Sequence, residues 1–214
     1  MIAYTPVDLP FQVPDYSALV SYVESNYLIN LEDTFGYTSL LCPLVARHPV
    51  TNWRDATDVF SDNNEGFNMI DNYQLYFPPN VRELFPSLFE LLNLLPYDQI
   101  VGAALNMHLK DLPAHQDEID TNEIYGPDRY NVLLSPHYGQ QSFFVSKDKI
   151  NKDYPVILKD YPVYAFNNKN IYHGADIVLD KRIIMVCAGV INNSKHQEII
   201  DRSVEKFKDY VIQY

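Results

Sequence analysis

Two histidines and a carboxylate are spaced in this chain so that they could bind one metal ion. His115 and Asp117 are two residues apart in the segment Pro113–Asp117. On an extended chain, residues i and i+2 point to the same side, so this imidazole and this carboxylate converge. A further imidazole follows at His173, fifty-six residues after Asp117. Because imidazoles and carboxylates are common ligands of divalent transition metals, the pattern predicts a metal site.

Arg182 adds an anion-binding group to the same pattern, nine residues after His173. A His-x-Asp pair alone arises easily by chance in a chain with six histidines. The same pair followed by a distant His and then by Arg is far more specific. Two His and one carboxylate on one face of an octahedral ion leave three positions open, as in non-heme Fe(II) oxygenases. A planar guanidinium stays charged and binds both oxygens of a carboxylate, so it suits an organic acid bound beside the ion.

On these residues the chain resembles the Fe(II)/2-oxoglutarate-dependent dioxygenase superfamily. The resemblance covers about residues 97–193 and is carried by His115, Asp117, His173 and Arg182. It looks closest to the prolyl-hydroxylase-like branch and to the small phage or bacterial oxygenases. It implies a double-stranded β-helix core, of the jelly-roll or cupin-like kind, in which the two His and the Asp bind Fe(II).

The resemblance also implies how 2-oxoglutarate would be held. Arg182 would form a salt bridge with the distal carboxylate of this co-substrate. Asn106 stands where relatives often place a polar contact to the same molecule, and Tyr130 or Asn131 could supply another. Relatives often carry a hydroxyl residue two positions after the Arg, but Ile184 occupies that position here. The second partner of the carboxylate must therefore come from elsewhere in the chain.

The implied reaction consumes dioxygen and a second substrate. 2-Oxoglutarate is oxidatively decarboxylated to succinate and CO₂, and a C–H bond of the second substrate is hydroxylated, which in some cases ends in demethylation. The iron carries the difficult chemistry, while the protein supplies orientation and a water-poor cavity. No segment identifies the substrate, and a small molecule, a peptide or a protein side chain fits the composition best.

Two other interpretations of these residues stay open. A cupin-like metal-binding isomerase would use a similar core with an additional His ligand, so His108 or His137 would have to join the metal. A non-catalytic β-sandwich, serving carbohydrate binding or assembly, would carry the His–Asp–His pattern by accident. The number of protein ligands distinguishes a cupin-like isomerase from an oxygenase. Full tolerance of His173→Ala would favour the non-catalytic β-sandwich.

A series of strands is expected to position these residues. From Val101 to Leu109 every odd residue is apolar, whereas the even ones change from small to polar and include Asn106 and His108. Such a strand buries one face under helices and lines a cavity with the other, and we expect the His-x-Asp pair at its end. The segment Arg182–Asn192 is apolar on both faces, which predicts a central strand. Four further strands are predicted, over Tyr130–Ser135, Ser142–Ser146, Val156–Lys159 and Val163–Asn167.

Three helices are expected outside this β region. The first follows Asp15, which can accept hydrogen bonds from a first helical turn. The second begins at Pro86, because proline is favoured in a first turn. The third follows Ser194 and Gln197, which match a capping box. Apolar residues recur at three- or four-residue spacing in each: Tyr16, Val20, Val23 and Tyr27; Leu88, Leu91, Leu92 and Leu95; Ile200, Val204, Phe207 and Val211.

These elements predict one domain over residues 1–214 with a mainly β fold and helical flanks. Residues 1–96 mix helix and loop, residues 97–193 form the β core, and residues 194–214 form one helix. Many short strands with helices towards the chain ends favour a β-sandwich or barrel buttressed by those helices.

Composition and charge limit the partners. Apolar residues make up 47% of the 214 residues, which excludes a disordered chain. A net charge of −12 repels phosphate backbones and argues against an extended nucleic-acid surface. Because no signal-peptide pattern or membrane-length apolar run is present, we expect a cytoplasmic monomer or homodimer with no membrane partner. Cys42 and Cys187 lie in apolar runs and are expected to be buried free thiols.

Overall fold

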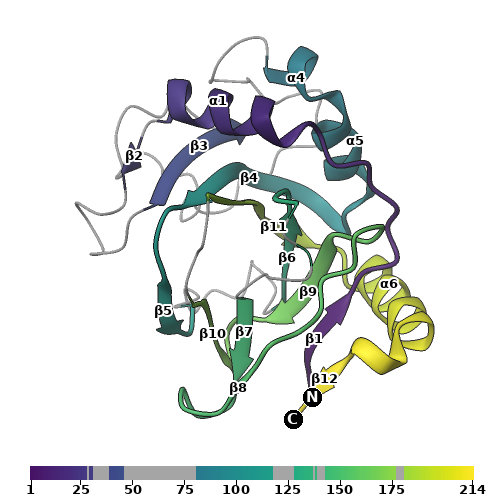
Figure 1. The fold of residues 1–214 in the computed structure, drawn as a ribbon. Coiled ribbons are helices and arrows are strands. Elements are labelled where there is room, and N and C mark those ends of the chain that lie inside the picture. Colours follow the sequence, from purple (N-terminus) through teal and green to yellow (C-terminus); the bar gives the residue numbers. More distant parts are fainter. Residues whose placement is uncertain are drawn as a thin grey trace.

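Two antiparallel sheets form the body of the described fold, and helices cover the outer face of the larger one (Figure 1). The mainly β fold with helical flanks is thereby confirmed. This computed structural model describes residues 1–27, 29–30, 39–45, 81–117, 128–136, 138, 143–176 and 181–214.

The larger sheet has eight strands in the order β12-β1-β9-β6-β11-β4-β3-β2. Its longest strands, β4 and β11, pair over nearly their whole length at the centre. This agrees with the prediction of a central strand from Arg182, because both faces of that strand are covered. The eight strands are β1 (Ile2–Pro6), β2 (Ile29–Asn30), β3 (Ser39–Val45), β4 (Tyr97–His108), β6 (Asp128–Leu133), β9 (Val163–Asn167), β11 (Arg182–Ile191) and β12 (Ile212–Gln213).

The smaller sheet has four strands in the order β5-β10-β7-β8. It lies against the inner face of the larger sheet, and apolar side chains of both sheets meet there. These side chains form the inner cluster, which includes Tyr164 and Ile184 of the larger sheet and Phe143 and Val145 of the smaller one. The four strands are β5 (Leu112–His115), β7 (Phe143–Ser146), β8 (Lys152–Asp153) and β10 (Tyr172–Ala175).

The outer face of the larger sheet carries the second apolar cluster, beneath the helices. Ala103, Leu105 and Met107 of β4 belong to this outer cluster, which confirms the predicted period-two burial of that strand. Leu19 of α1 and Ile200 of α6 pack into the same cluster. Within the described residues the helices are α1 (Tyr16–Asn26), α4 (Val81–Leu84), α5 (Pro86–Leu94) and α6 (Asn193–Lys206), with a 3₁₀ turn, η1, at Lys208–Tyr210.

The starts of α1 and α5 agree with the sequence. The Asp15 carboxylate accepts a hydrogen bond from the Ala18 amide at 2.8 Å, and α5 begins at Pro86. The buried residues of α1 are Leu19, Tyr22 and Val23, and the predicted Tyr16 and Val20 are partly buried against the outer cluster. Tyr27, which was expected on the same face, lies just beyond the helix and is exposed.

Some local predictions are wrong. Residues 194–214 were expected to form one helix, but α6 ends at Lys206 and Ile212–Gln213 form β12, which pairs with β1. Residues 1–96, expected to mix helix and loop, also supply β1, β2 and β3 to the larger sheet.

The α6 helix is capped by Asn192, whose side chain accepts from the Lys195 amide at 2.9 Å, and not by Ser194. Asparagine caps as well as serine, so the earlier residue takes the role. The segment Val156–Lys159 is not a strand of either sheet, and only Leu158 forms a bridge, with Tyr161. A single side chain of this segment is buried, but its backbone forms no hydrogen-bonded ladder with a neighbouring described strand.

The predicted burial of the two thiols is confirmed. Cys42 and Cys187 are both buried and neither is in a disulfide, and burial raises the pKa of the Cys42 thiol to about 12. None of the helices in the described ranges is both long enough and apolar enough to cross a membrane.

Candidate metal centre

The smaller sheet places the two predicted histidine ligands opposite each other on neighbouring strands. His115 on β5 and His173 on β10 are directly opposed in the antiparallel pairing of these strands. Their ring centroids are 4.3 Å apart. The His-x-Asp pair was expected at the end of the strand that carries Asn106. It lies instead at the end of β5, a separate strand in the smaller sheet. Asp117, just beyond β5, is fixed by its backbone amide, which donates to the Asn168 carbonyl at 2.9 Å.

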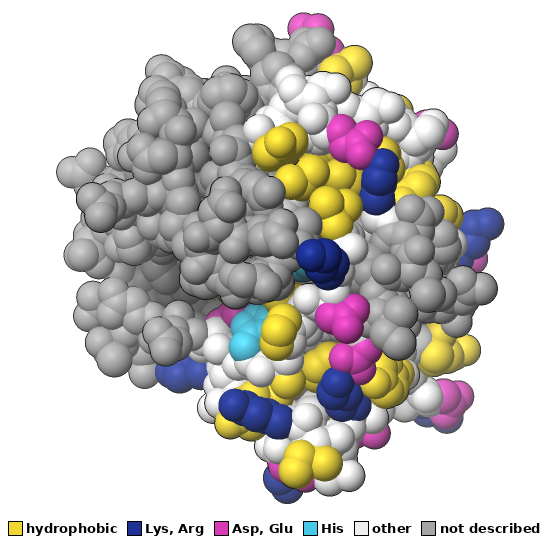
Figure 2. Space-filling view, turned by 60° about the vertical axis from the view of Figure 1, so that its left-hand side comes forward, with side chains coloured by type: hydrophobic (Ala, Val, Ile, Leu, Met, Phe, Trp, Pro, Cys, Tyr) yellow, Lys and Arg dark blue, Asp and Glu magenta, His cyan; other side chains and the backbone are white. Residues whose placement is uncertain are grey.

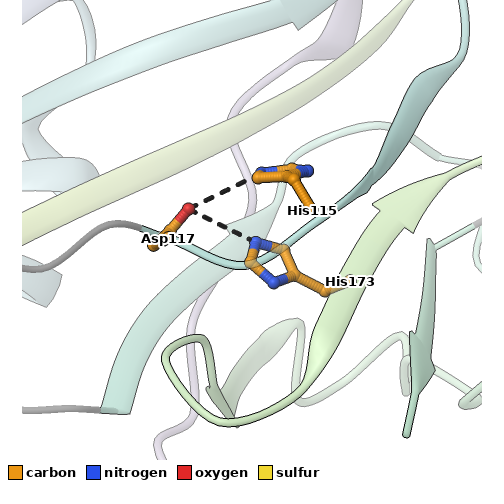
Figure 3. Close-up of side chains that lie close together, drawn as sticks. All are labelled: His115, Asp117 and His173. Carbon is orange, nitrogen blue, oxygen red and sulfur yellow. Dashed lines mark ion pairs between the residues drawn. The ribbon is translucent and has the colours of Figure 1, made fainter. Parts of the chain in front are cut away.

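The three side chains converge on one point (Figure 3). Asp117 Oδ1 lies 3.5 Å from His115 Nε2 and 3.6 Å from His173 Nε2. Two ligand atoms that are each about 2.1 Å from one ion can be at most about 4.2 Å apart. Both separations fall below this limit, so one metal ion fits between the carboxylate and each imidazole.

Hydrogen bonds around these groups favour the ligand forms of the side chains. His115 Nδ1 lies 2.8 Å from the Pro113 carbonyl. Since a carbonyl only accepts, Nδ1 donates there and the lone pair on Nε2 is left for a metal. The second carboxylate oxygen of Asp117 accepts from Asn168 Nδ2 at 2.8 Å. The donor set and its surroundings thus fit a divalent transition metal.

Exposure of the three side chains is uneven. The side chain of His173 is 6% exposed and that of Asp117 is 15% exposed, whereas that of His115 is 39% exposed. Figure 2 shows a histidine side chain at the surface of the face it presents, among basic, acidic and apolar side chains. The His173 side chain is therefore enclosed, whereas the His115 side chain is partly open to solvent.

Gly174 lets β10 approach its neighbours closely enough to place His173. A Cβ atom at Gly174 would lie 2.5 Å from the Leu112 carbonyl oxygen and 2.7 Å from Phe144 Cζ. The Leu112 oxygen is backbone of the neighbouring β5, so it cannot move away without disturbing the sheet, whereas the end of the Phe144 ring can swing aside. Glycine is thus required here by space.

We expect Gly174→Ala to lower the free energy of unfolding by about 1–3 kcal/mol, the usual cost of overpacking. Metal affinity should fall as well, because β10 must move relative to β5. Urea denaturation and metal titration measure the two effects, and Gly174→Ser should be at least as harmful. An alanine variant as stable as the parent would contradict this constraint.

Arg182 is a buried cation on the inner face of the larger sheet. Within the described residues its side chain makes one hydrogen bond, from Nη2 to the Tyr164 hydroxyl at 3.3 Å, and its Nε has no partner there. No carboxylate in the described ranges forms an ion pair with it. A buried charge is costly without a counter-charge, so this position favours an anionic ligand.

His108 lies directly beside Arg182, because the two residues are opposed in the pairing of β4 and β11. Burial, and to a lesser degree the charges of Arg182 and His115, lowers the pKa of His108 to about 3. The ring is therefore neutral at pH 7, with one donor and one acceptor. Neither nitrogen has a hydrogen-bond partner among the described residues, and His108 is not part of the three-residue metal group.

The other residues predicted to contact the co-substrate do not all lie on the same face of the larger sheet. Asn106 is on the inner face, where its side-chain oxygen accepts a hydrogen bond from the Ser39 hydroxyl. Asn131 is opposed to Tyr164 in the sheet, and its side-chain oxygen is buried without a partner in the described part of the chain. Tyr130 is not brought to this region, because its ring lies in the outer cluster and its hydroxyl contacts His196 Nδ1 at 2.8 Å.

Two residues of this region were not singled out from the sequence. Tyr164 supplies a hydroxyl to Arg182, and Asn168 supplies an amide to Asp117. Successive residues of β9 point to opposite faces of the sheet, so the pattern could have placed Tyr164 on the inner face. Asn168 lies in a turn and gave no comparable signal. His137, the other candidate for an additional ligand, lies outside the described residues.

Comparison with models of protein families and with curated proteins gives no match for this chain. Inference about its activity therefore depends on the residues and their geometry.

Proposed function

We propose that this protein is a non-heme Fe(II) and 2-oxoglutarate-dependent oxygenase built on a double-stranded β-helix core. One observation carries the proposal: the ligand atoms of His115, Asp117 and His173 gather within 4.8 Å of one another at β5, the residues just after it and β10, while a buried arginine without a carboxylate partner among the described residues lies on the facing sheet. Three protein ligands leave three positions open on an octahedral ion. A bidentate organic acid and dioxygen would use them.

In this proposal His115, Asp117 and His173 hold Fe(II), which when bound supplies the activation of dioxygen and the oxidative decarboxylation of 2-oxoglutarate. Arg182 binds the distal carboxylate of 2-oxoglutarate by a charge-assisted pair of hydrogen bonds. The Tyr164 hydroxyl, already in contact with Arg182, is suited to be the second partner that Ile184 cannot provide. Neutral His108 can donate one hydrogen bond in the same region without adding a competing charge.

Of the two additional ligands that a cupin-like isomerase could use, His108 is described and argues against that function. Only three residues in the described ranges form the metal group, and His108 is not one of them. A non-catalytic β-sandwich leaves the buried charge of Arg182 without a role. The substrate that is oxidised remains a proposal by class: a small molecule, a peptide or a protein side chain reaching the ion from the exposed His115 side.

The direct test is Fe(II)-dependent formation of succinate from 2-oxoglutarate. Purified metal-free protein is given Fe(II), ascorbate and 2-oxoglutarate in air, and succinate is measured over time. Slow turnover without a second substrate is expected, and Zn(II) in place of Fe(II) should give none. If neither Fe(II) nor 2-oxoglutarate binds or raises the unfolding temperature, the proposed function is wrong.

A further inference from the structure

Asn168 contacts the candidate ligand Asp117 in two ways. Its backbone carbonyl accepts from the Asp117 amide at 2.9 Å, and its side-chain Nδ2 donates to Asp117 Oδ2 at 2.8 Å. Because a carboxylate only accepts, the atom facing it must be the amide NH₂, which fixes the orientation of the Asn168 side chain. The oxygen of Asp117 that faces the histidines is Oδ1, so the two oxygens have separate partners.

The surroundings of Asn168 indicate that its side chain serves Asp117 and not the turn that contains it. Asn168 is 3% exposed, and its side-chain oxygen has no hydrogen-bond partner among the described residues. The neighbouring Asn167 closes the turn instead, because its side-chain oxygen accepts from the Asn170 amide at 2.9 Å. A buried carbonyl without a donor is unfavourable, so a favourable interaction must offset its burial. The hydrogen bond from the Asn168 amide to Asp117 is that interaction.

We infer that Asn168 is a positioning residue that holds Asp117 as a ligand through one oxygen only. This inference rests on the proposed metal site. With Oδ2 engaged by the amide, only Oδ1 is left for the ion. Two histidines and one carboxylate oxygen then occupy three positions, whereas a carboxylate bound through both oxygens would occupy one more. Asn168 thereby keeps open a position that the co-substrate or dioxygen needs.

The test is metal binding by the full-length metal-free protein carrying Asn168→Leu, which keeps the size of the side chain but removes the donor. The backbone contact between Asn168 and Asp117 is unaffected by this change. Loss of an outer hydrogen-bond partner typically lowers metal affinity about 10–100-fold, and we expect a loss in this range for Mn(II). Asn167→Ala is the matched control, since it weakens the same turn without touching Asp117, and its Mn(II) affinity should equal that of the parent.

Water-proton relaxation by bound Mn(II) provides a second measurement, because it reports how many exchangeable waters the ion retains. If Asp117 binds through both oxygens once the amide is gone, relaxation per bound ion should fall in Asn168→Leu. Should that variant not fold, Asn168→Ala serves for both measurements. Parent-like Mn(II) affinity and relaxation in a folded Asn168 variant would overturn the inference while leaving the proposed function intact. Absence of Mn(II) and Fe(II) binding by the parent protein would instead overturn the proposed function.

Discussion

Replacing His173 with alanine is expected to abolish metal binding and the formation of succinate that depends on it. His173 is the most buried of the three ligands, and without it only Asp117 and the partly exposed His115 remain. Loss of an outer partner costs about 10–100-fold in affinity, so loss of a direct ligand should cost more than about 100-fold. Titration with Fe(II) under nitrogen, followed by dialysis and iron analysis, measures the effect.

His196→Ala is the matched control, because the same residue type is removed from a different place. His196 lies on α6 and contacts the Tyr130 hydroxyl beneath the helices. This variant should bind one Fe(II) as the parent does. The His173 ring packs at 4.8 Å from that of Phe166, so circular dichroism and thermal unfolding must show that His173→Ala is folded. A folded His173 variant that binds Fe(II) normally would rule out the proposed metal site.

Replacing Arg182 with methionine is expected to leave metal binding intact and to remove binding of 2-oxoglutarate. Truncating one partner of a buried charge pair costs about 2–5 kcal/mol, which is roughly a 30- to 4,000-fold loss of affinity. The ligand-free variant should be at least as stable as the parent, because the change removes a buried charge that has no counter-charge in the described residues. Calorimetry of 2-oxoglutarate binding in the presence of Mn(II) gives the affinity.

Lys181→Met is the control for this second variant. Lys181 is adjacent in sequence, but its side chain is 38% exposed and forms an ion pair with Glu24. The Lys181→Met variant should therefore bind 2-oxoglutarate as the parent does. Binding should raise the unfolding temperature of both proteins by the same amount. If Arg182→Met binds 2-oxoglutarate as tightly as Lys181→Met does, Arg182 is not the carboxylate-binding residue.

The convergence of the candidate metal ligands could be predicted because its strongest signal is local. The i, i+2 spacing of His115 and Asp117 on extended chain already places both side chains on one side. His173 required the assumption that two distant segments pair, and the structure supplies that pairing between β5 and β10. The assignment to a separate small sheet was missed, because the sequence gives no measure of where the chain leaves β4 and crosses to the other layer.

The contacts around the ligands could not be predicted in the same way. Alternation shows that Tyr130 and Asn131 face opposite sides of a strand, but which side is the inner one depends on the packing of the helices. The contact between Asn168 and Asp117 joins two turns from different parts of the chain, and no periodic pattern marks it. Element boundaries, such as the cap of α6 at Asn192, depend on competition between equally suitable neighbours.

The position of β5 in the smaller sheet has a consequence for how the metal is retained. β5 is at an edge of that sheet and pairs only with β10 among the described strands, yet it and the residues just after it carry two of the three ligands. Edge strands open more easily than interior ones, and a ligand that binds only the closed form shifts this equilibrium. Ion retention and hydrogen-exchange protection of β5 are therefore linked: opening of this strand would release the ion, and chelation would loosen the strand.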